Sequence, residues 1–142
     1  MKTAKRRFAG FAVGLLAAVI LALPTPALAY VQREEIVNSG HGSIAPQYLV
    51  VHETANAGAS AANHVKLYSR GYSYAVHYVA ELDGSTIYHT MRDDRKSWSV
   101  GRGNPYVVSI EMAHATNAQD FYEQYSQVAQ WCANYLKGRG WG

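Results

Sequence analysis

The sequence of 142 residues contains a single cysteine, Cys132, and this scarcity excludes whole classes of structure. One thiol cannot form an intramolecular disulfide, so a secreted module held together by disulfides is excluded. Histidine pairs at the short spacings of metal-binding motifs are absent as well. His52-Glu53 would begin the zinc-peptidase motif, but position 56 is Asn56 where that motif needs a second histidine. Packing, or a bound metal, must therefore stabilise the domain.

An excess of positive charge is also missing once the N-terminal segment is considered separately. Residues 1–29 have a basic start, an apolar run and a final Ala-Leu-Ala, the pattern of a cleaved signal peptide. Pro24 and Pro26 shorten the apolar run, which disfavours the alternative of a membrane anchor. The segment holds four of the thirteen basic residues and no acidic residue, so the formal charge of residues 30–142 is −1 instead of +3. We therefore expect a secreted protein without a membrane anchor after cleavage, and the composition gives no support for a nucleic-acid partner.

The 113 residues after the signal peptide suit one small domain, without internal repeats or low-complexity linkers. Residues 30–46 are expected to form an irregular lead-in with the loop "NSGHGS", and residues 47–142 to form the domain. Apolar runs predict strands, and Asp83-Gly84 predicts the tight turn of a hairpin. In chain order we expect a strand at 48–53, a helix capped by Ser60 and ended by Gly71, a hairpin at 72–91, a long loop at 92–105, a strand at 106–114 and a helix at 118–138. This order predicts an α/β fold with a mixed central sheet flanked by helices.

The last helix is amphipathic, and its apolar residues recur every three or four positions. The spacing predicts an inner face made of Phe121, Tyr125, Val128, Cys132 and Tyr135. A cysteine on that face is an ordinary buried thiol rather than the nucleophile of a cysteine peptidase.

Two polar side chains interrupt apolar strands. His52 ends the run that begins at Tyr48, and Glu111 lies within "VVSIEMA". One interpretation is structural, namely a strand-end histidine and a buried carboxylate with a partner. The other is functional: a metal ligand and a general acid or base on neighbouring strands, the minimal chemistry of zinc hydrolysis. His77 is expected to line the same pocket, whereas four histidines look like surface or loop residues: His41, His64, His89 and His114.

Four segments, in this order, carry a family resemblance: "YLVVHETAN", "YAVHYVAELDGSTIYH", "SWSVGRGN" and "VVSIEMAHA". Together they resemble the type-2 N-acetylmuramoyl-L-alanine amidases, a family that includes phage endolysins, bacterial wall amidases and the peptidoglycan recognition proteins. The resemblance runs from about Gln47 to the end of the chain and is strongest for the endolysin-like branch. It implies a secreted, cell-wall-associated hydrolase with zinc as cofactor and peptidoglycan as partner. The bond cut would be the amide between the lactyl group of N-acetylmuramic acid and L-alanine of the stem peptide.

The resemblance also implies roles for single residues. His52 falls on the first zinc ligand of the family, and Glu111 falls on the general base. Val76 stands where other members carry a catalytic tyrosine, which leaves the catalytic work to Glu111. Trp98 and Asn104 map to the loop at the substrate groove, and we expect His77 to bind substrate with them.

The remaining zinc ligands of the family are a histidine and a cysteine or aspartate, in a strand and loop that follow the last helix. The resemblance therefore implies that they lie beyond Gly142, and Cys132 does not match either of them. We expect an amidase domain that is incomplete at its C-terminus and binds zinc poorly as written. A catalytically inactive peptidoglycan-binding module, or an inactive fragment of such an amidase, is the alternative.

Overall fold

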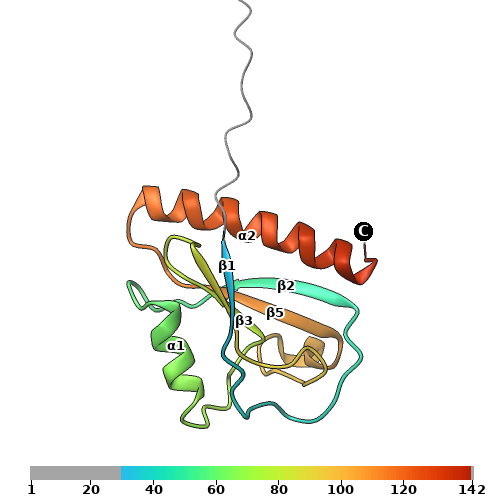
Figure 1. The fold of residues 1–142 in the computed structure, drawn as a ribbon. Coiled ribbons are helices and arrows are strands. Elements are labelled where there is room, and N and C mark those ends of the chain that lie inside the picture. The colour runs from blue at the N-terminus through green and yellow to red at the C-terminus, as the bar shows by residue number, and fades with distance from the viewer. Residues whose placement is uncertain (1–29, 142) are drawn as a thin grey trace, which may run out of the picture.

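The computed structural model describes residues 30–141; the expected signal peptide, residues 1–29, lies outside the described residues. One five-stranded sheet, in the order β1-β4-β3-β5-β2, lies between helices on its two faces (Figure 1). The strands are β1 (Val31–Glu34), β2 (Tyr48–Glu53), β3 (Tyr78–Ala80), β4 (Thr86–His89) and β5 (Val107–Met112). The helices are α1 (Ala61–Tyr68), α2 (Ala118–Arg139) and a 3-10 turn, η1 (Gly101–Tyr106). The predicted α/β class with a mixed sheet is confirmed.

The lead-in is more ordered than the sequence predicted, because it contains β1. This strand pairs in parallel with β4, so that Val31 lies opposite Thr86 and Glu34 lies opposite His89. All four residues of β1 are exposed. β1 is held at the edge of the sheet by backbone hydrogen bonds. Because none of its side chains is buried, its sequence lacks the alternation of apolar and polar residues that predicts a strand.

The first helix and the hairpin form where the sequence predicted them. Ser60 caps α1, and its side chain accepts a hydrogen bond from the Asn63 N–H. β3 and β4 pair antiparallel, and the connection between them turns at Gly84, whose φ of +72° favours glycine. None of the helices in residues 30–141 has the length and apolar character needed to cross a membrane.

The inner face of α2 differs from the prediction in the first half of the helix. Phe121 and Tyr125 are 54% and 61% exposed, so their assignment to the core was wrong. The buried residues are Gln124, Gln127, Val128 and Trp131. Cys132 and Tyr135 do pack against the core from a partly buried position.

Buried glutamines replace apolar residues there because this half of α2 covers backbone carbonyl groups in the segments that follow β3 and β5. The Gln124 amide donates to the carbonyls of Glu81 (2.8 Å) and Ala113 (2.7 Å), and the Gln127 amide donates to the carbonyl of Asp83 (3.2 Å). Buried carbonyl groups need donors, so polar side chains are favoured at these helix positions.

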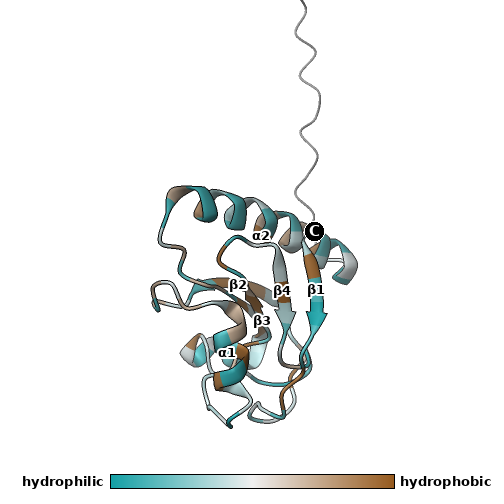
Figure 2. Cartoon of the chain, turned by 60° about the vertical axis from the view of Figure 1, so that its left-hand side comes forward, coloured by the Kyte–Doolittle hydropathy of each residue, from teal (hydrophilic) through white to brown (hydrophobic). Residues whose placement is uncertain are grey.

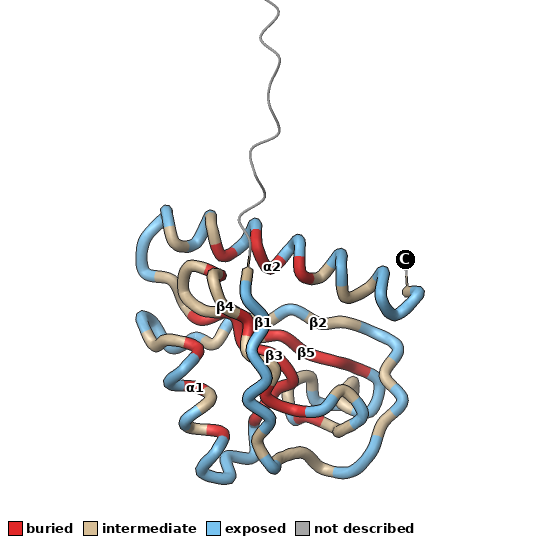
Figure 3. The backbone as a smooth tube through the Cα atoms, viewed as in Figure 1, coloured by how far each residue is buried: buried red, intermediate tan, exposed pale blue. Residues whose placement is uncertain are grey.

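The sheet has an apolar core on each face. Figure 2 shows the apolar residues gathered in the central strands, and Figure 3 shows β3 and β5 as the most buried elements. Val108, Ile110 and Met112 of β5 belong to the core that includes Val128 and Trp131 of α2. Because side chains alternate along a strand, Ser109 and Glu111 point to the opposite face, the face covered by α1. The second core, on that face, contains Ala61, Tyr68, Ala75, Val76, Val79 and Met91.

Candidate functional site

His52 and Glu111 lie side by side on two neighbouring strands. β2 and β5 are parallel, and the register places the Cα of His52 opposite the Cα of Glu111. Directly paired residues of parallel strands lie on one face of the sheet, about 4.8 Å apart. Both residues are close to the carboxyl ends of their strands, where α/β sheets hold their functional groups. The structure therefore brings together the two residues that the sequence singled out.

Buried polar atoms without partners are concentrated at this place. His52 Nε2, Thr54 Oγ1 and Glu111 Oε2 are buried, and none of them makes a hydrogen bond within residues 30–141. Each such atom costs about 1–3 kcal/mol of stability, so a cluster of three marks a site built to bind something. An imidazole nitrogen beside a carboxylate oxygen fits a zinc ion by donor type.

The donor set for a metal is incomplete, however. The described part of the chain contains no group of three or more His, Cys, Asp or Glu side chains that could hold a metal ion. A catalytic zinc takes three protein ligands and keeps one open position. His52 therefore fits as one ligand.

Glu111 also forms part of the wall of a pocket of about 260 Å³ beside α1. Burial raises the pKa of Glu111, an effect that the nearby His64 opposes and the charge of Glu53 reinforces. A carboxylate with a raised pKa is a better proton acceptor near neutral pH than an exposed one. The other residues that line this pocket are Thr54, Asn56, His64, Leu67, Tyr68, Tyr72 and Tyr74.

Of the residues that line this pocket, only Glu111 was predicted as a site residue, and His64 and Tyr68 are two that the sequence analysis missed. Both are buried on the inner face of α1, where His64 had been expected at the surface. The ring of His64 is fixed by a hydrogen bond of 2.9 Å between its Nδ1 and the carbonyl of Ser60. Burial and the charge of Glu111 raise the pKa of Tyr68. The helical spacing of Ala61, His64 and Tyr68 was the available signal, because residues three and four apart share one face.

His77 does not take the position expected of a substrate-binding residue. It has no exposed surface. Its Nε2–H donates to the carbonyl of Arg95 (2.8 Å), and its Nδ1 accepts from the backbone N–H of Ser109 (3.1 Å). Burial lowers the pKa of His77, which favours the neutral ring that this arrangement needs. We correct its assignment: His77 ties the loop after β4 to β5 and is not accessible to a substrate.

Trp98 and Asn104 belong to the loop between β4 and β5. Trp98 is 43% exposed and meets Tyr74, a pocket residue, edge to face with 6.2 Å between ring centroids. Through Tyr74, Trp98 thus lies beside the Glu111 pocket, and we call this pocket, with Trp98 at its edge, the groove. The Asn104 side-chain oxygen accepts from the backbone N–H groups of Ser99 (3.0 Å) and Val100 (2.8 Å), so Asn104 shapes this loop. A direct contact of Asn104 with substrate stays a prediction.

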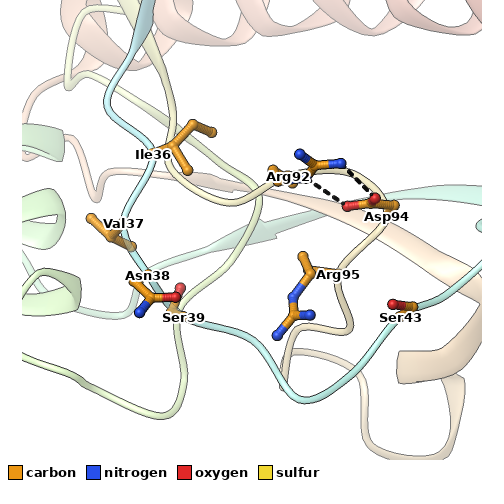
Figure 4. Close-up of a pocket in the computed structure, with 8 residues that line it drawn as sticks. All are labelled: Ile36, Val37, Asn38, Ser39, Ser43, Arg92, Asp94 and Arg95. Atoms are coloured by element: carbon orange, nitrogen blue, oxygen red, sulfur yellow. Dashed lines mark hydrogen bonds and ion pairs between the residues drawn. The ribbon is translucent and has the colours of Figure 1, made fainter.

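Two other features contribute nothing to this site. Cys132 is partly buried against the core, and burial raises the pKa of its thiol to about 11, as expected for an unreactive cysteine. A larger pocket, of about 480 Å³, lies between the lead-in and the loop after β4 (Figure 4). Arg92 and Asp94, two positions apart in the loop after β4, pair with each other at the edge of this pocket at 2.8 Å. Neither His52 nor Glu111 lines it.

Comparisons with known proteins agree with this geometry. The family model described as N-acetylmuramoyl-L-alanine amidase matches residues 42–142. The bifunctional autolysin of Staphylococcus aureus is 32% identical over 97 residues, which make up 67% of this chain and 8% of that protein. The chain thus spans less than a tenth of the length of the curated relatives it matches.

Solved structures show the same fold. The Staphylococcus aureus hydrolase AmiA, solved in complex with its ligand, aligns with a TM-score of 0.69 at 26% identity, over 79% of this chain and 58% of that chain. A mutant endolysin from Bacillus subtilis aligns with a TM-score of 0.64 at 22% identity, over 78% of this chain and 77% of that chain. The family match includes both His52 and Glu111, and it confirms the resemblance seen in the sequence. This chain belongs to the N-acetylmuramoyl-L-alanine amidase family.

Proposed function

We propose that this chain is a secreted, zinc-dependent peptidoglycan amidase that hydrolyses the bond between the lactyl group of N-acetylmuramic acid and L-alanine of the stem peptide. One observation carries the proposal. His52 and Glu111 are register partners on one sheet face, and each has a buried polar atom that makes no hydrogen bond within the described residues. The family supplies the reaction class, and the signal-peptide pattern of residues 1–29 supports action outside the cell, at the wall.

The chain's own residues have distinct tasks in this reaction. His52 would hold the metal through its imidazole. When bound, zinc supplies Lewis-acid polarisation of the amide carbonyl and activation of the attacking water. Glu111 accepts the proton of that water and passes it to the nitrogen of the leaving L-alanine. The pocket around Glu111 keeps the carboxylate partly desolvated, and its raised pKa helps it to hold the proton between the two transfers.

The other zinc ligands, in our proposal, come from sequence outside the described residues. His52 alone is too few for a stable zinc site, because catalytic sites use three protein ligands. The 142-residue chain by itself should then bind much less than one zinc per molecule and cleave peptidoglycan slowly.

A binding role without catalysis is the second candidate. It is favoured by the finding that residues 30–141 hold no group of three metal-ligating side chains. In this case the groove near Glu111 and Trp98 would bind muropeptides, and no bond would be broken.

Zinc content and amide cleavage, measured together, separate the two candidates. We would compare the 142-residue chain with a chimera that carries, after Gly142, the C-terminal segment of a family member that supplies a histidine and an aspartate. Metal analysis should give about one zinc per chimera and much less for the short chain. Mass spectrometry should detect stem peptide with a free N-terminal L-alanine from the chimera. A folded, zinc-loaded chimera that binds muropeptide but releases no such peptide would favour the binding role.

One result would show that the ligands are misassigned. If the short chain bound one zinc and turned over as fast as the chimera, other histidines would have to complete the site. His64 and His114 would then be the first residues to replace.

Export is tested separately from catalysis. Expression of the whole sequence in a bacterial host should release a product whose mass corresponds to a start at Tyr30. Retention of Met1 in a membrane fraction would contradict the proposed cleavage.

A further inference from the structure

The lead-in segment "NSGHGS" places a histidine against the groove tryptophan. The ring of His41 stacks on the ring of Trp98 with 3.8 Å between centroids and 11° between planes. Its Nε2 forms a 3.0 Å hydrogen bond with the carbonyl of Ser73, in the segment between α1 and β3. His41 therefore contacts both the segment before β3 and the loop before β5.

The backbone around His41 is held firmly to that loop. The N–H of His41 donates to the carbonyl of Lys96, and the N–H of Lys96 donates to the carbonyl of Gly42, each at 2.8 Å. Gly40 and Gly42 have φ angles of +104° and +103°, which side chains disfavour. A Cβ at Gly40 would lie 3.1 Å from the Cβ of Arg95, so the two segments are also closely packed. Because Lys96 is two residues before Trp98, these bonds fix the histidine ring relative to the tryptophan.

Two further exposed aromatic side chains, Tyr74 and Tyr72, lie next to Trp98 in a row. Tyr74 meets Trp98 at 6.2 Å, and Tyr72 lies 5.6 Å from Tyr74. The three side chains are 43%, 59% and 46% exposed for Trp98, Tyr74 and Tyr72. Tyr72 and Tyr74 also line the pocket that contains Glu111. Rings that stay exposed beside a groove offer a large, rigid contact surface to a ligand.

We propose that Trp98, Tyr74 and Tyr72 form an aromatic wall that binds a sugar ring, and that His41 is the positioning residue of this wall. The ligand class is an N-acetylated pyranose of the glycan strand, so the inference rests on peptidoglycan being the substrate. Aromatic faces suit the C–H faces of a sugar, and the tyrosine hydroxyls can bond its polar groups. The residues that line the adjoining pocket include no lysine or arginine, which a subsite for the carboxylates of the stem peptide would need. His41 precedes the family match at residues 42–142, so membership of the family does not assign it a role.

The test measures binding without turnover. All proteins carry Glu111→Gln in the 142-residue chain, and calorimetry compares two ligands: a disaccharide of N-acetylglucosamine and N-acetylmuramic acid that bears the stem peptide, and the same stem peptide without sugar. His41→Ala should weaken binding of the disaccharide ligand about three- to tenfold, the usual range for loss of an aromatic pair. The affinity for the sugar-free peptide should differ by no more than about twofold between the protein with His41→Ala and the protein without it.

Three further variants complete the design. Trp98→Ala should show the same selective loss, and His41→Phe should restore most of the affinity because it keeps the stacked ring. Tyr125→Ala removes a ring that is 61% exposed on α2, away from the wall, and should leave both affinities unchanged. The near-UV circular dichroism of the ligand-free protein should change in His41→Ala and recover in His41→Phe, since Trp98 contributes to this signal and its contribution depends on the ring stacked against it.

Several results would overturn the inference. They are an unchanged affinity in His41→Ala, an equal loss for both ligands, no recovery in His41→Phe, or no binding of the disaccharide ligand by the Glu111→Gln protein. Failure of the proposed amidase function would look different. In that case the chimera would release no stem peptide, while the selective loss of sugar binding in His41→Ala would still be observed.

Discussion

Gln124 should be one of the most important polar residues for stability, although it lies on a surface helix. It is 1% exposed, and its amide donates to two carbonyls that follow the central strands, those of Glu81 and Ala113. Gln124→Ala removes both donors. The Ala113 carbonyl lies in a buried bond and would lose its partner at a cost of about 2 kcal/mol, whereas the Glu81 carbonyl would keep the N–H of Gly84 (2.8 Å) as a donor, which limits its loss to about 1 kcal/mol. We therefore expect a loss of about 3 kcal/mol in the free energy of unfolding.

Urea unfolding followed by far-UV circular dichroism measures this loss. With an m-value of about 2 kcal/mol/M, a loss of about 3 kcal/mol moves the midpoint down by about 1.5 M. Gln130→Ala is the matched control, because Gln130 is an exposed glutamine of the same helix. Its unfolding free energy should change by no more than about 0.5 kcal/mol. If Gln124→Ala cost less than about 1 kcal/mol, or as little as the control, the two carbonyl contacts would not hold α2 on the sheet.

Two other substitutions test how α2 packs against the sheet. Asp93 accepts hydrogen bonds from Tyr78 (3.0 Å) and Tyr135 (2.8 Å), and pairs with His89 and Arg139. Burial alone would raise the pKa of Asp93, but these partners lower it well below its ordinary value. The resulting stabilisation is present above about pH 4, the unfolded pKa, and is lost as the pH falls through the lower folded pKa. Asp93→Asn should therefore lower the unfolding free energy at pH 7 by about 2–4 kcal/mol. The unfolding free energy of the variant should also decrease less between about pH 4 and pH 2 than that of the unchanged protein. An equal decrease in the variant and the unchanged protein would contradict this. Gly84→Ala should lower it by more than about 2 kcal/mol, because the φ there is +72° and a Cβ would lie 2.7 Å from the Cα of Gln124. Gly71→Ala, at φ +82° with nothing within 4 Å, should cost only the backbone strain of about 1 kcal/mol, and equal thermal shifts for the two variants would refute the close approach.

The sequence predicted those elements that carry an apolar run or a turn dipeptide, including β2, although no residue of β2 is fully buried. β2, β5 and the hairpin have apolar runs or a turn dipeptide, and the structure places them where these signals lie. β1 could not be predicted, because its four residues are exposed and are held by backbone pairing to β4. The inner face of α2 was misassigned because the first half of the helix meets backbone carbonyls rather than apolar side chains, which requires buried glutamines.

The site was predictable only in part. His52 and Glu111 stand out as polar residues in apolar strands, but their juxtaposition depends on β2 pairing with β5, far along the chain. No local pattern encodes that pairing, so the residues alone left it as one of two interpretations, and the family resemblance favoured it. His64 and His77 show the opposite difficulty. Both are histidines in ordered elements, and only the fold shows that the first lines the Glu111 pocket while the second is buried.

Amide cleavage by the chimera and its site variants tests the central claim most directly, namely that His52 and Glu111 form the catalytic pair of a peptidoglycan amidase. Mass spectrometry of a defined muropeptide should show release of stem peptide with a free N-terminal L-alanine. Glu111→Gln should lower the rate at least about 100-fold while zinc content is kept, since a general base contributes 10²–10⁴-fold. His52→Ala should lose both zinc and activity, whereas Glu123→Gln, a change on α2 outside the pocket, should leave both unchanged. Undiminished cleavage by Glu111→Gln, or full zinc content in His52→Ala, would contradict the account.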